Sequence, residues 1–122
     1  MEKIKKETLE KKRKKFIYIC APCRGDTREE VNHNIGRAIS FGKEAYREGF
    51  IPIIPHLLTF VFSPSIKSED RKGRECATEI LSKCDLMWVC TTGVSAGMRK
   101  EIEFCVKHHI PLVFNLGKTK AL

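Results

Sequence analysis

Apolar residues along the chain gather in short runs that alternate with longer segments of mixed polarity. Each run is continuous and rich in β-branched or aromatic residues, which is typical of strands in a parallel sheet covered on both faces. The pattern therefore predicts four buried strands. They span residues 16–20, 50–55, 86–90 and 110–116.

The segments between these runs carry apolar residues at the spacing of one helix face. The first predicted helix begins near Thr27 and ends near Gly49. Either Asp26 or Thr27 can cap its start. Two further helices precede the third and fourth strands. The inward residues of the three helices are Val31, Ile35, Ala38, Gly42 and Ala45; Ala77, Ile80, Leu81 and Cys84; and Met98, Ile102, Cys105 and Val106.

Strict alternation of strands with helices predicts a mainly parallel sheet. Pro52 and Pro55 lack amide hydrogens, so the second strand belongs at a sheet edge. Right-handed crossovers then favour the strand order 2-1-3-4. We expect a three-layer α/β domain, similar to flavodoxin-like and Rossmann-like folds, in which helices cover both faces of a sheet of four or five strands.

The length of 122 residues suits one domain, and the net charge of +8 is concentrated at its start. Residues 1–15 hold eight Lys or Arg and three Glu, and we interpret them as a basic N-terminal tail or helix before a single domain at 16–122. Aromatic residues do not interleave with these basic residues as in readers of single-stranded nucleic acid. We therefore do not expect nucleic-acid binding through the tail.

Apolar runs are all shorter than the roughly 18 residues of a membrane span, so no membrane partner is expected. The N-terminus lacks the apolar core of a secretory signal, which favours a cytoplasmic location. Six cysteines are then expected to be reduced. No second pair of Cys or His residues follows Cys20 and Cys23 at zinc spacing, so we predict no metal and no cofactor.

Two loops contain the residues best suited to chemistry. In the predicted order, ligands bind beyond the carboxyl ends of the first and third strands. Glycines, a serine at a helix start and an arginine suit an anion such as phosphate or a sugar hydroxyl, and a histidine after the second strand could reach the same ligand. The candidate binding residues are Cys20, Arg24, Gly25, Asp26, His56, Ser95, Gly97 and Met98.

Glu101 is the candidate nucleophile. A carboxylate beside such a pocket can attack an anomeric carbon and form a glycosyl intermediate. The alternative interpretation is structural, because a glutamate in the first turn of a helix is favoured by the helix dipole alone.

Four segments together resemble the nucleoside 2-deoxyribosyltransferase superfamily, which includes deoxynucleoside 5′-monophosphate N-glycosidases. The chain is most similar to the uncharacterised DUF4406/DUF7768-like branch, and the likeness runs from residue 16 to about residue 116. Each motif is short, and their order and spacing carry most of the resemblance. The motifs are YICAPCRGD (18–26), PHLL (55–58), CDLMWV (84–89) and SAGMRKEIE (95–103).

The resemblance implies cleavage of an N-glycosidic bond in a nucleoside or nucleotide, with the 2-deoxyribosyl group passed to a base or to water. It assigns Glu101 as the nucleophile and Tyr18 as the residue that orients it. It also implies a homo-oligomer. Arg24 and Gly25 match the family's first-loop Arg-Gly, and Ser95 and Gly97 match the anion-binding serine and glycine of its N-glycosidase branch.

One position departs from the family pattern. The aspartate that assists the leaving base is replaced by Ala77, and Glu75 and Glu79 lie on other sides of the helix. Such assistance is typically worth about 10²- to 10⁴-fold in rate, so Asp26, His56 or water would have to supply the proton.

Two alternative functions therefore stay open. One is a nucleotide-binding module without catalysis, which the loss of the aspartate favours. The other is a thiol oxidoreductase that uses the CxxC motif of Cys20 and Cys23. The turn formers after Cys23 weigh against it, because they delay the helix start that would lower the pKa of Cys20.

Overall fold

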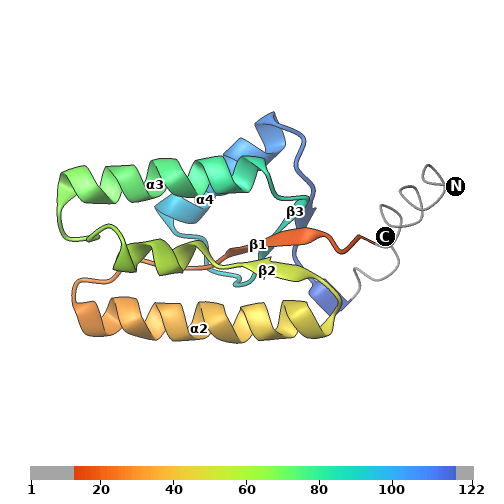
Figure 1. Ribbon diagram of the computed structural model, residues 1–122, viewed down its shortest axis with the longest axis horizontal. Helices are drawn as coiled ribbons and strands as arrows, with labels where there is room; N and C mark the ends of the chain where they lie inside the picture. Colours follow the sequence, from red (N-terminus) through yellow and green to blue (C-terminus); the bar gives the residue numbers. More distant parts are fainter. Residues whose placement is uncertain (1–12, 118–122) are drawn as a thin grey trace, which may run out of the picture.

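Strands and helices alternate in the computed structural model, which describes residues 13–117 (Figure 1). Most of the predicted basic tail therefore lies outside the described residues. No described helix has the length and apolarity needed to cross a membrane. The elements are β1 (Phe16–Cys20), α2 (Arg28–Arg47), β2 (Ile51–Ile53), the 3₁₀-helix η1 (Pro55–Phe60), α3 (Lys67–Ser82), β3 (Leu86–Val89), α4 (Ala96–Lys107) and β4 (Leu112–Val113).

The described strands form one all-parallel sheet of order β2-β1-β3-β4, which confirms the predicted topology. β2 lies at the edge, as Pro52 requires, and Pro52 pairs with Ile17 of β1. The edge strands are shorter than predicted. Pro55 begins η1 instead of extending β2, and β4 pairs with β3 only through Leu112 and Val113.

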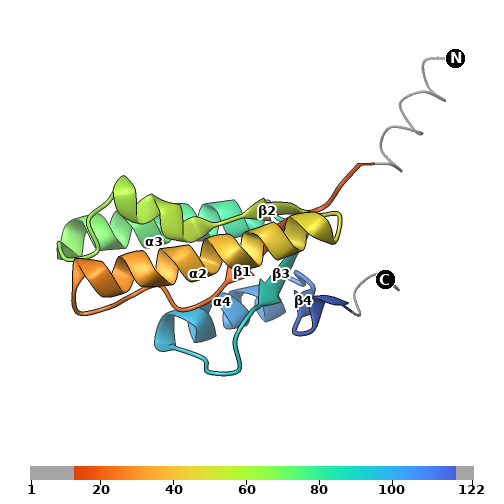
Figure 2. The ribbon, with the colours of Figure 1, turned by 90° about the horizontal axis from the view of Figure 1, so that it is seen from below.

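Helices cover both faces of the sheet, with α2 on one side and α3 and α4 on the other (Figures 1 and 2). Alternate residues of β1 serve the two cores, because successive side chains of a strand point to opposite faces. Ile17 and Ile19 pack toward α2, whereas Tyr18 and Cys20 belong to the core beneath α3 and α4. This alternation places Tyr18 and Cys20 on the same side as Glu101.

Side-chain caps fix the amino ends of α2 and α4, the helices that follow the two predicted site loops. The Thr27 hydroxyl accepts the Glu30 amide at 3.1 Å at the start of α2, and the Ser95 hydroxyl accepts the Met98 amide at 3.3 Å at the start of α4. After α2 the chain turns at Gly49, whose φ of 96° favours glycine.

The prediction that Val106 faces the core is wrong. Val106 is 64% exposed, because it lies about 100° around α4 from the buried Cys105.

Candidate functional site

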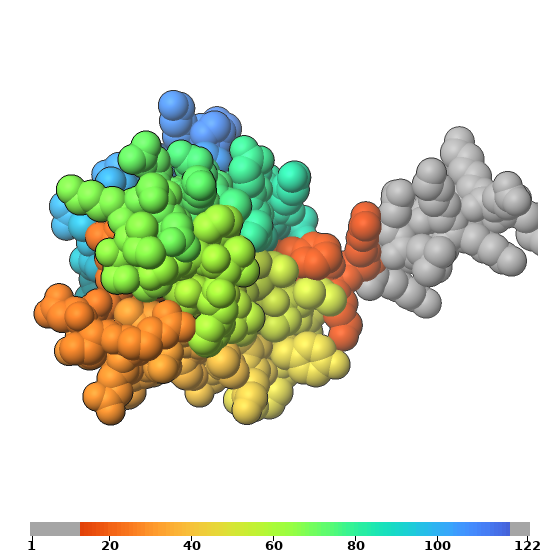
Figure 3. Space-filling view, turned by 60° about the vertical axis from the view of Figure 1, so that its left-hand side comes forward, coloured from red at the N-terminus to blue at the C-terminus, as the bar shows by residue number. Residues whose placement is uncertain are grey.

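A cavity of about 370 Å³ lies on the α3–α4 side of the sheet, beyond the carboxyl end of β1. Its walls come from β1 and the following loop, η1, α3 and α4. In the space-filling view, α3 and η1 pack side by side (Figure 3). Seven of the predicted site residues line the cavity: Tyr18, Arg24, His56, Ser95, Gly97, Met98 and Glu101.

Glu101 is held by two donors from β1. The Tyr18 hydroxyl donates to Oε2, and the Cys20 thiol donates to Oε1 with an S–O distance of 3.6 Å. Tyr18 and Cys20 are two residues apart on one strand, so both side chains reach the same face. Glu101 lies in the second turn of α4, and the first turn holds no acidic residue, so a first-turn dipole effect does not explain its position.

Burial shapes the protonation of this cluster. Desolvation raises the pKa of Glu101, while the hydrogen bonds from Tyr18 and Cys20 and the positive charge of Arg74 act in the opposite direction. Burial and the neighbouring carboxylate raise the pKa values of Tyr18 and Cys20, so both keep their protons and act as donors. The site thus holds a carboxylate of raised pKa between two fixed donors, and perturbed groups of this kind are common at functional sites.

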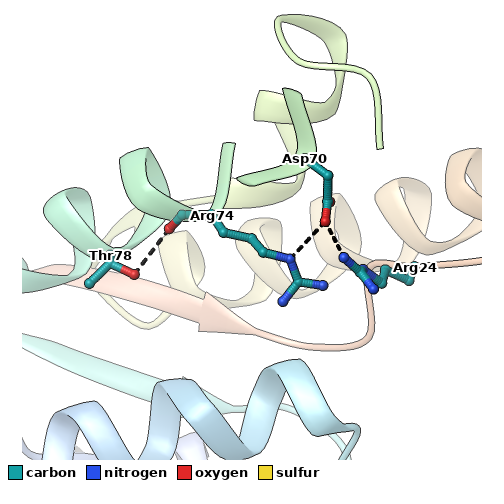
Figure 4. Close-up of polar contacts among 4 residues, drawn as sticks. All are labelled: Arg24, Asp70, Arg74 and Thr78. Atoms are coloured by element: carbon teal, nitrogen blue, oxygen red, sulfur yellow. Dashed lines mark hydrogen bonds and ion pairs between the residues drawn. The ribbon is translucent and has the colours of Figure 1, made fainter. Parts of the chain in front are cut away.

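A cationic rim borders the cavity between α3 and α4. Asp70 accepts a hydrogen bond from Arg24 and another from Arg74 Nε, the latter at 3.0 Å. Figure 4 shows Arg74 pointing from α3 into the space above α4, and the Thr78 hydroxyl donating to the Arg74 carbonyl oxygen. A second cavity of about 390 Å³ is lined by Arg24, Arg74, Ala96, Gly97 and Lys100. Three cations beside the amino end of α4 form an arrangement suited to an anion.

Sequence reasoning missed Asp70, Arg74 and Lys100. Asp70, Arg74 and Thr78 recur every four residues, which places them on one face of α3 and could have indicated a polar wall. Lys100 directly precedes Glu101, and from the sequence alone it resembles an ordinary solvent-exposed lysine on a helix. Ala77 also lines the cavity.

Three predicted binding residues lie outside the cavity lining. Cys20 is fully buried beneath Glu101. Gly25 and Asp26 pack at the start of α2, where the Asp26 amide donates to Glu30 Oε2 at 2.6 Å. Asp26 is therefore poorly placed to give a proton to a base inside the cavity.

His56 joins η1 to the loop after β1. Its Nε2 lies 3.0 Å from the Ala21 carbonyl oxygen and 3.1 Å from the Pro22 carbonyl oxygen, so this nitrogen carries the proton. The side chain is 2% exposed, and burial lowers its pKa. His56 is thus a neutral clamp on the cavity wall, with its one proton already engaged.

Replacing His56 by Ala is expected to lower the free energy of unfolding by about 2–4 kcal/mol, because it opens a cavity and removes the partner of a buried carbonyl oxygen. The unfolded chain binds a proton near the ordinary His pKa of 6.5, whereas the folded protein resists it, so stability should fall as the pH drops below about 6.5. Urea unfolding at pH 7 and pH 5.5 measures both effects. Exposed His33→Gln is the control, and an equal pH dependence in His56→Gln and wild type would contradict this assignment.

All six cysteines are free thiols. Burial raises the pKa values of Cys20 and Cys23, whereas a dithiol oxidoreductase needs a lowered one. The electrostatics of the CxxC segment therefore run against the oxidoreductase hypothesis. Within residues 13–117, no three His, Cys, Asp or Glu side chains gather as a metal site would require.

Comparison with known families matches residues 15–115 to a family described as a domain of unknown function, DUF7768. No curated protein is significantly similar to the chain. The matched segment contains the whole described sheet and every residue that lines the two cavities. The chain therefore belongs to the DUF7768 family.

Proposed function

We propose that the protein cleaves the N-glycosidic bond of a nucleotide, with Glu101 as the nucleophile. The observation that carries this proposal is the hydrogen-bonded pair of Tyr18 and Glu101 at the wall of a cavity with a cationic rim. The resemblance to the nucleoside 2-deoxyribosyltransferase superfamily supports the same roles for both residues.

The proposed reaction proceeds in two displacements. A Glu101 oxygen attacks the sugar C1′, the bond from C1′ to the base nitrogen breaks, and its electron pair leaves with the base. The base takes a proton from water, because Ala77 stands at the family's aspartate position and the His56 proton is bound to carbonyl oxygens. Water or a second base then attacks C1′ and releases Glu101 as a carboxylate.

The rim favours a phosphate-bearing substrate over a bare nucleoside. Arg24, Arg74 and Lys100 supply three positive charges, of which Asp70 balances one. The Ser95 oxygen accepts the Met98 amide, which leaves the hydroxyl hydrogen available to an anion. A phosphate at the amino end of α4 would meet guanidinium, ammonium, hydroxyl and backbone donors together.

Purified protein incubated with each 2′-deoxynucleoside and its 5′-monophosphate tests the proposal, with free base measured by chromatography. We expect release from at least one monophosphate and slower release from the matching nucleoside. Nucleotide-dependent thermal stabilisation without release from any substrate would overturn the catalytic proposal and favour the binding module instead.

Self-association, which the resemblance implies, stays a prediction. Exposed apolar side chains in η1 and the following loop, the segment that also lines the cavity, offer a surface for it. Sedimentation velocity is expected to show a dimer or larger species that Phe60→Asp weakens, while a monomeric wild type would contradict the prediction. The side chains are Leu57, Phe60, Val61 and Ile66.

A further inference from the structure

The two oxygens of Glu101 have unequal partners. Oε2 accepts from the Tyr18 hydroxyl, which is a strong donor, and Oε1 accepts from the Cys20 thiol, which is a weak one, across 3.6 Å. Tyr18 and Cys20 are both fully buried, so a hydroxyl or thiol that lost its acceptor there would not be exposed to water.

We infer that Glu101 attacks C1′ through Oε1, and that Cys20 is a positioning residue that orients this oxygen without binding it firmly. The inference rests on the proposed function and adds which atom forms the bond and why a cysteine stands at this position.

The cost of losing each hydrogen bond decides between the two oxygens. When a carboxylate becomes a glycosyl ester, the oxygen bonded to C1′ becomes a poor acceptor, while the other becomes a carbonyl oxygen that still accepts. Attack through Oε2 would leave the buried Tyr18 hydroxyl without its acceptor, which is costly in a protein interior. Attack through Oε1 gives up only the weak bond from the Cys20 thiol.

The electron and proton balance of this step is simple. Oε1 forms the bond to C1′, the bond from C1′ to the base breaks, and the base nitrogen leaves with the electron pair and is protonated by water. The Tyr18 and Cys20 protons stay in place, consistent with the raised pKa values of both groups. When water displaces the ester, Oε1 recovers its charge and the thiol donates to it again.

Cys20→Ala tests the positioning role. Loss of a donor to the anion should raise the pKa of Glu101 and move the acid limb of kcat/KM toward higher pH by roughly half to one pH unit. The Glu101 titration, followed by ¹³C NMR of labelled glutamate, should move by the same amount. Cys90→Ala, the same truncation at the end of β3, should leave both unchanged. An unmoved titration in Cys20→Ala would overturn the role.

The attacking oxygen is tested by a crystal structure of the wild-type protein with a 2′-deoxy-2′-fluoronucleoside 5′-monophosphate, whose fluorine slows release of the glycosyl enzyme. We expect C1′ bonded to the oxygen beside Cys20, with Tyr18 still donating to the other. An ester through the oxygen beside Tyr18 would overturn this inference alone. Failure to form any adduct would overturn the proposed function together with it.

Discussion

Glu101→Gln is expected to lower base release by about four orders of magnitude or more while leaving the protein folded. Removing a nucleophile from a site that acts as a unit costs on the order of 10⁴- to 10⁶-fold in rate. The Gln carbonyl oxygen can still accept from Tyr18, so the wall of the cavity keeps its shape. Single-turnover release of base from the best monophosphate is the measurement.

Glu103→Gln is the matched control, because it makes the same change on an exposed position of the same helix. It should release base at the wild-type rate. If Glu101→Gln and Glu103→Gln both retained activity, Glu101 would not be the nucleophile. If both lost it equally, a general effect on α4 would be responsible instead.

Glu101→Gln should also increase the stability of the folded protein at neutral pH. The pKa of Glu101 lies above its ordinary value of 4.5 in the folded protein, so the folded protein holds this proton more tightly than the unfolded chain does. Stability is therefore lost as the pH rises from about 4.5 through the folded pKa, and the whole loss is present above it. Gln does not ionise, so its advantage in the unfolding midpoint should be full at pH 7 and shrink toward pH 4.5.

The strand order could be predicted because each determinant is local. Pro52 confines its strand to an edge, and right-handed crossovers then favour the order of the other three strands. Strand lengths could not, because the apolar character of residues 50–55 and 110–116 continues after pairing stops. At Pro55 the chain turns into η1, and at Phe114 the side chain is 66% exposed beyond the last pair.

The sequence predicted only part of the candidate site. The loops after β1 and β3 contain glycines, an arginine and a serine that suit an anion, so Arg24 and Ser95 could be chosen as site residues. Glu101 could be chosen because it follows the second loop in α4. Asp70 and Arg74 resemble an ordinary surface ion pair at spacing i, i+4. Only the packing of α3 over the sheet brings them to the cavity, and that packing depends on contacts between distant segments rather than on local sequence.

Arg74→Ala is expected to weaken binding of the 5′-monophosphate by about 10- to 100-fold and to leave binding of the nucleoside nearly unchanged. A charge-assisted hydrogen bond is worth about 1.5–3 kcal/mol, and 1.4 kcal/mol corresponds to a factor of ten in affinity. Isothermal titration calorimetry of the Glu101→Gln protein with both ligands measures binding without turnover. On the proposed function, rising salt should weaken binding of the nucleotide more than binding of the nucleoside, because only the phosphate would pair with the rim.

Arg71→Ala is the control, since it removes the same charge from an exposed position of α3 that lines neither cavity. Equal losses for nucleoside and nucleotide in Arg74→Ala would show that Arg74 supports the cavity wall rather than a phosphate.

Loss of Arg74 has a second consequence that separates binding from chemistry. Its positive charge lowers the pKa of Glu101 against the larger effect of burial, so its removal should raise that pKa further. In the Arg74→Ala protein with Glu101 intact, the acid limb of the rate of base release should then move to higher pH. Lys100→Ala should weaken nucleotide binding with little movement of that limb. A phosphate site and a nucleophile that share one arginine would connect substrate charge directly to the ionisation of Glu101.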